Sequence, residues 1–122
     1  MAHTLPSAAH GDSLYITKIE PKYEGRGDAR HIIGTEIVVM LLFDHCTPVP
    51  IVIRGLDAAT LPDDRVVTER NMSKNFLIGR FKDLVITYRG GEYGSVVYSG
   101  TASGVEISNL TPPASAAGNS KT

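Results

Sequence analysis

HIIGTEIVVMLLFDHCTPVPIVIR, residues 31–54, is the longest apolar run of the chain and contains its own turn. The apolar residues between positions 35 and 43 show no three-four helical spacing, and many are β-branched, which favours an extended strand. Pro48 and Pro50 then interrupt the run, because proline cannot donate to a strand ladder. The apolar pattern resumes at 51–53. The stretch therefore predicts two neighbouring antiparallel strands in the middle of a small β-domain.

Shorter alternating segments on both sides of this stretch predict further strands, separated by turn-forming residues. The segments 76–81 and 84–88 read either as separate strands or as one long strand with a kink near Gly79 or at Lys82-Asp83. The paired glycines of RGGEYG favour a hairpin loop, since glycine tolerates positive φ. The additional strands are predicted at 13–20, 76–81, 84–88, 95–99 and 104–108, and the loops at 21–30 and 89–94.

The segment from Gly55 to Asn75 lacks a strand pattern. Structureless loops of this length are uncommon in compact domains, so we expect one or two helical turns. Thr60 is the expected cap, with Pro62 in the first turn and aspartates near the positive end of the helix. This adds one short helix to the predicted strands.

The predicted order is strand, long central strand, strand, helix, strand, strand. It predicts an all-β fold, mainly antiparallel, either a small OB-like barrel or a β-sandwich with one short helix. The chain of 122 residues is expected to be a single domain. We expect an N-terminal arm at 1–12, the β-domain at 13–108 and a flexible Pro/Ala/Ser-rich C-terminal tail at 109–122.

The amino-acid composition limits the classes of protein to which the chain can belong. With 42% apolar and 20% charged residues the chain can form a core. A net charge of −1 excludes a globally basic nucleic-acid binder but not a local basic face. One cysteine rules out an intrachain disulfide framework. Without a signal-peptide pattern or a membrane-length apolar run, we expect a soluble, cytoplasmic protein.

Asp44, His45 and Cys46 form the one tight cluster of catalytic or metal-binding residue types. In an extended chain His45 points away from the other two, which works against a shared metal ion. A zinc site also needs more ligands with paired spacings. We therefore expect a hairpin corner with a semi-buried thiol, no catalytic residue, no metal and no cofactor. An enzyme would need this cluster to lie in a cleft with a partner group.

Positive charge is concentrated between residues 65 and 89. Six basic and two acidic side chains give this segment a net charge of +4. Basic side chains follow phosphates while flat rings stack on bases, and tyrosines lie close by in the sequence. The competing interpretation is that the rings belong to the core and the charges to a solvated face. The candidate nucleic-acid-binding residues are Arg65, Arg70, Lys74, Arg80, Lys82, Tyr88, Arg89, Tyr93 and Tyr98.

Two functions follow as hypotheses. The first is non-catalytic binding of single-stranded DNA or RNA without sequence preference, on a basic β face that carries aromatic rings. The alternative is a structural or assembly module, such as a viral decoration or accessory subunit in the virion, that forms homo-oligomers through its terminal arms. Neither requires a membrane.

Overall fold

The computed structural model describes residues 3–5, 13–41, 46–91 and 94–108. These residues form a mostly β structure with one α-helix, which confirms the predicted all-β class. The elements are β1 (His3–Thr4), β2 (Ser13–Glu24), η1 (Gly27–Ala29), β3 (His31–Leu41), β4 (Thr47–Arg54), η3 (Ala58–Thr60), α2 (Asp64–Met72), β5 (Leu77–Lys82), β6 (Val85–Gly90), β7 (Val96–Thr101) and β8 (Gly104–Ile107).

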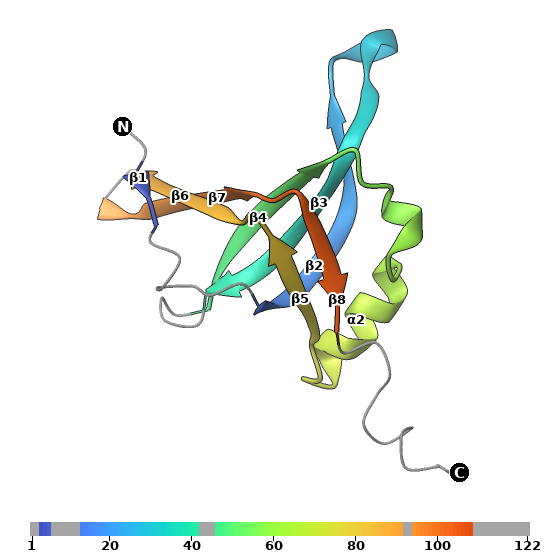
Figure 1. Cartoon of the computed structure of the whole chain (residues 1–122), viewed down its shortest axis with the longest axis vertical. Coiled ribbons are helices and arrows are strands. Elements are labelled where there is room, and N and C mark those ends of the chain that lie inside the picture. The colour runs from blue at the N-terminus through green and yellow to red at the C-terminus, as the bar shows by residue number, and fades with distance from the viewer. Residues whose placement is uncertain (1–2, 6–12, 42–45, 92–93, 109–122) are drawn as a thin grey trace.

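The eight described strands belong to one sheet in the order β1-β6-β7-β4-β3-β2-β5-β8 (Figure 1). Every neighbouring pair is antiparallel except β4 and β7, which are parallel. The sheet is open, with β1 and β8 at its edges. No second sheet, as a β-sandwich would need, occurs among the described residues.

The meander β2-β3-β4 contains the predicted central hairpin, and its alternation determines the core. Ile37 and Val39 of β3 are fully buried, and Ile51 pairs with Ile37 across the β3–β4 ladder. The intervening positions, such as Val38, are half-exposed. Burial of such side chains contributes roughly 1.5–3 kcal/mol each, so this inner face supplies much of the stability.

Gly34 lies within β3. Its residue type is fixed by packing, since a Cβ atom there would overlap the carbonyl oxygen of Ile53 on β4. Gly34 also pairs with Lys22, next to an irregularity in the β2–β3 ladder. Close approach of two backbones therefore explains this glycine.

The predicted loop at 21–30 is wrong over its first half. β2 continues through Pro21 to Glu24, and β2 and β3 form a long arm that projects from the body (Figure 1). Only 25–30 form the turn, which includes η1. Pro21 pairs with Thr35 on β3, and β5 pairs with β2 only at residues 13–16, so β2 has a described neighbour on one side only at this proline, as is usual for proline in a sheet.

The helix begins later than the sequence suggested. Asp63, not Thr60, caps α2, because its carboxylate accepts a hydrogen bond from the N–H of Val66 at 3.0 Å. Thr60 ends the separate turn η3. The helix packs on β2, where Asn71 Nδ2 donates to the carbonyl oxygen of Thr17 at 2.7 Å.

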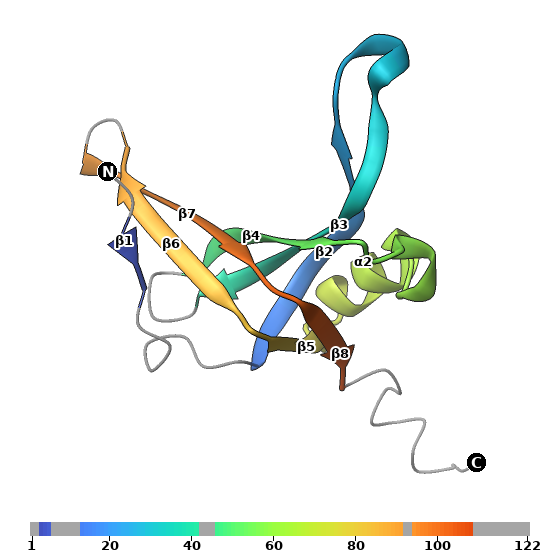
Figure 2. The ribbon, with the colours of Figure 1, turned by 45° about the horizontal axis from the view of Figure 1, so that its top comes forward.

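A kink between β5 and β6 confirms the predicted break at Lys82-Asp83. Asp83 has a positive φ of 52°. The N–H of Ser103 donates to the carbonyl oxygen of Lys82 at 2.9 Å, and Ser103 Oγ donates to Asp83 Oδ2 at 2.7 Å. Beyond the kink the partner changes: β5 pairs with β8, and β6 pairs with β7 (Figure 2). The kink thus separates two regions that are continuous in sequence.

Candidate nucleic-acid interface

The predicted basic segment divides over three places in the fold. One group lies in or just after α2, a second on β5 and a third on the β6–β7 hairpin. Tyr93 lies outside the described residues. The helix carries Arg65 and Arg70, the turn after it carries Lys74, β5 carries Arg80 and Lys82, and the hairpin carries Tyr88, Arg89 and Tyr98.

The cations of the helical region do not form one surface. Arg65 is exposed and its Nε lies 3.5 Å from Glu69 Oε1, one helical turn away. Arg70 is only 6% exposed, and its Nε donates to the carbonyl oxygen of Asn75 at 2.6 Å. It therefore holds the end of the helix against the next segment. Lys74 is exposed beyond the helix with a positive φ of 59°.

The β6–β7 hairpin separates its rings from its cation. Tyr88 and Tyr98 are paired across the two strands, with ring centroids 6.3 Å apart, and both are half-buried. Tyr98 packs against the core cluster. Arg89 follows Tyr88 directly, so it faces the opposite side of the hairpin. Stacking on Tyr88 and a phosphate contact by Arg89 would thus occur on different faces.

On β5, by contrast, alternation brings ring and charge to one face. Leu77 and Phe81 are buried with the core. The alternate positions Ile78, Arg80 and Lys82 point outward and are half- or fully exposed. Phe76, just before the strand, has the same parity as these outward residues.

Strand pairing adds a residue to this face that the sequence pattern does not indicate. Tyr15 on β2 lies opposite Ile78 and is 38% exposed. Its ring centroid is 5.7 Å from that of Phe76, with the planes tilted by 45°. The signal was hidden because Tyr15 is 61 residues before Phe76 in the sequence. We call the set Tyr15, Phe76, Ile78, Arg80 and Lys82 the β5 face.

Two surface hollows lie along the β5 face. The larger, of about 520 Å³, is lined by Arg80, Phe81, Lys82, Asp83 and Glu106. The smaller, of about 250 Å³, is lined by Ser13, Leu14, Tyr15 and Ile78. The ring of Tyr15 thus borders one recess and the two cations of β5 border the other, and both recesses open to solvent.

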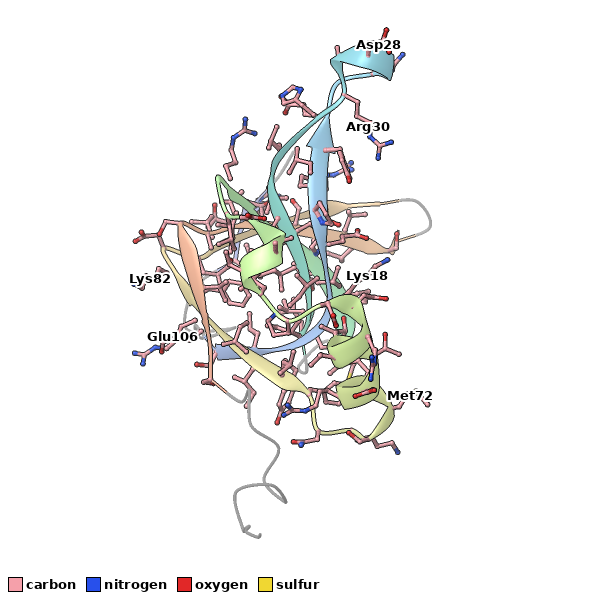
Figure 3. All side chains as sticks on the ribbon, turned by 90° about the vertical axis from the view of Figure 1, so that its right-hand side faces the viewer. Lys18, Asp28, Arg30, Met72, Lys82 and Glu106 are labelled. Atoms are coloured by element: carbon pink, nitrogen blue, oxygen red, sulfur yellow. The ribbon has the colours of Figure 1, made fainter. Side chains whose placement is uncertain are left out.

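Acidic groups share the larger hollow. Glu106 on β8 lies opposite Arg80 in the β5–β8 ladder, and Asp83 follows Lys82. In Figure 3, Lys82 and Glu106 project outward on the same side of the molecule. The hollow is thus lined by two cations and two carboxylates, whose charges sum to zero. Any attraction for an anion therefore depends on where each charged group lies, and not on the net charge of the hollow.

The possible catalytic cluster is described in part. Cys46 is exposed, so the expected semi-buried thiol is wrong. Asp44 and His45 lie outside the described residues. Within the described part of the chain, no three histidine, cysteine or acidic side chains gather in a way that would hold a metal ion.

Comparisons with known proteins give no family for the chain: no family model, no curated protein and no solved structure matches it. Among the described residues, no helix has both the length and the apolar character needed to span a bilayer.

Proposed function

We propose that the protein is a non-catalytic binding module for single-stranded nucleic acid, and that the β5 face is its contact surface. The observation that carries the proposal is the shared parity of Phe76, Arg80 and Lys82 on one strand, with Tyr15 beside them. Arg65, Arg70, Tyr88, Arg89 and Tyr98 lie on other elements, and the proposal does not use them.

The chemistry of this face suits a flexible polynucleotide. From Phe76 to Lys82 the outward side chains follow about 20 Å of extended backbone at roughly 3.3 Å per residue. Rings at one end offer π-faces to bases of any identity, and cations at the other end neutralise phosphates. Stacking without base-edge hydrogen bonds gives little sequence preference, as in other single-strand binders.

The proposed architecture is an OB-like barrel with an interrupted fourth strand. The supporting features are the β2-β3-β4 meander, the helix that follows it, and a return hairpin that contacts both ends of the meander. In this description β5 and β6 are the halves of one strand broken at Asp83, and β7 and β8 are the halves of the next. OB-type barrels recurrently bind oligonucleotides on their strands.

The proposal is tested by fluorescence anisotropy with a labelled oligothymidylate of about 15 nucleotides, within the range of site sizes for such folds. We expect binding at 50 mM salt that weakens steeply by 200 mM, since released counterions drive the association. Absence of binding at 50 mM salt, or binding that does not respond to salt, would overturn the proposal. A duplex of the same length serves as the comparison ligand and should bind less well.

A further inference from the structure

The outer edge of β6 is occupied by the N-terminal segment of the chain. In β1, His3 pairs with Tyr88 and Thr4 pairs with Thr87 in an antiparallel ladder. The N–H of Leu5 extends this ladder by donating to the carbonyl oxygen of Ile86 at 2.7 Å. The edge of β6 thus accepts a short extended peptide.

Two side chains of this peptide contact particular groups of the protein. The imidazole of His3 lies 5.3 Å from the ring of Tyr88, centroid to centroid. Leu5 is half-buried and packs against the core cluster. The edge of β6 therefore recognises a ring at one position, an apolar side chain two residues later, and the backbone between them.

The same segment is weakly held. The strand has two residues, His3 and Thr4, both exposed. Seven residues, 6–12, connect Leu5 to the start of β2. So short a pairing is marginal in water, and when β1 separates from β6 it leaves an open strand edge that is ready to pair.

We propose that the edge of β6 exchanges its occupant with a second copy of the chain, so that the N-terminal strands of two molecules cross over reciprocally. The peptide that satisfies this edge is carried by every copy, and exchange reproduces the same contacts in a closed two-fold arrangement at low cost. The β1–β6 contact is thus a reversible dimer interface. It is independent of the proposed nucleic-acid binding.

Disulfide trapping tests this directly. One copy carries Thr4→Cys and the other Thr87→Cys, both in a Cys46→Ser background that removes the single native cysteine. Directly opposite residues of an antiparallel pair lie within disulfide range. Because each copy has one cysteine, a disulfide between the cysteines at positions 4 and 87 can form only between two molecules.

The matched control replaces Thr87→Cys by Ser99→Cys. Ser99 is exposed and lies opposite Thr87 on β7, one strand further from β1. That separation is beyond disulfide reach, so the control measures random collision. A short tether holds the strand of the same molecule at an effective concentration of about 1 mM, so a second copy competes with it when its own concentration approaches that value. At such concentrations exchange predicts a yield of the mixed disulfide dimer at least about tenfold above that of the control. Equal yields in the two mixtures would overturn the proposal.

A second measurement covers the case in which the cysteine variants do not fold. Sedimentation of the unmodified protein should show a mass that rises with concentration toward a dimer. Leu5→Asp removes the apolar contact and should keep the protein monomeric. An unmodified protein that stays monomeric up to about 1 mM, or a Leu5→Asp variant that dimerises equally, would contradict strand exchange.

Discussion

The β5 face and the β6–β7 hairpin have nearly the same ingredients in the sequence, yet they present them differently. Each has aromatic rings and at least one arginine within a few residues. In β5 the ring and the cations are separated by even numbers of residues, so they share a face. In β6, Tyr88 and Arg89 are adjacent and lie on opposite faces. Parity along the strand, and not local composition, decides whether rings and charges form one surface.

The kink at Asp83 is what keeps these two regions apart. The hydrogen bonds from Ser103 to Lys82 and Asp83 stabilise the change of direction and of partner strand.

The largest effect is expected from the cations. The double variant Arg80→Ala/Lys82→Ala should weaken oligothymidylate binding by about 50-fold at 50 mM salt and lower the salt slope by about 1.4, since each phosphate contact on a single strand contributes about 0.7 to that slope. Anisotropy titrations over several salt concentrations measure both quantities.

The matched control for the cations is Arg65→Ala/Arg89→Ala. It removes the same charge from α2 and the β6–β7 hairpin, and should change the affinity by less than about twofold because distant exposed charges are screened. Equal losses in the two double variants would show that overall charge, and not the β5 face, attracts the ligand.

A smaller effect is expected from the rings. Tyr15→Leu retains apolar area but removes a stacking surface, and should weaken binding by about tenfold. Tyr88→Leu on the β6–β7 hairpin is the parallel change, and we expect the affinity to stay within about twofold, because its ring lies outside the β5 face. The same anisotropy assay compares the variants. A larger loss from Tyr88→Leu than from Tyr15→Leu would transfer the stacking site to the hairpin.

The contribution of the kink at Asp83 is tested by measuring the free energy of unfolding. Ser103→Ala removes the side-chain hydrogen bond to Asp83 and should lower the free energy of unfolding by about 1 kcal/mol. Urea unfolding followed by circular dichroism gives the midpoint and the slope. Thr101→Ser, an exposed change two residues away, should leave the midpoint in place. If the two variants unfold alike, the hydrogen bond does not stabilise the kink.

The smallest effect comes from the acidic side of the hollow. Glu106 lies opposite Arg80, so Glu106→Gln removes a like charge from the path of the phosphates and should tighten oligothymidylate binding by about threefold at low salt. Asp28→Asn at the tip of the β2–β3 arm, far from the β5 face in Figure 3, should leave the affinity unchanged. Weaker binding of the Glu106→Gln variant would mean that this carboxylate orients Arg80 for the ligand.

Some of the candidate site followed from the sequence and some did not. The alternation of Phe76, Ile78, Arg80 and Lys82 was readable once the segment was taken as a strand. Arg70 was misleading, because a basic residue on a weakly amphipathic helix gives no sign that its guanidinium will be buried against Asn75. Tyr15 could not be assigned, since its proximity to Phe76 depends on the pairing of β2 with β5.

The sequence by itself determined the β class, the central hairpin and the single short helix, and it placed a break either near Gly79 or at Lys82-Asp83, because branching, alternation and turn residues act over a few positions. The tertiary structure alone decided which strands became neighbours, how far the β2–β3 arm extends, and which cations share a face with rings. Those outcomes depend on ladders between residues tens of positions apart, and local periodicity contains no information about the partner.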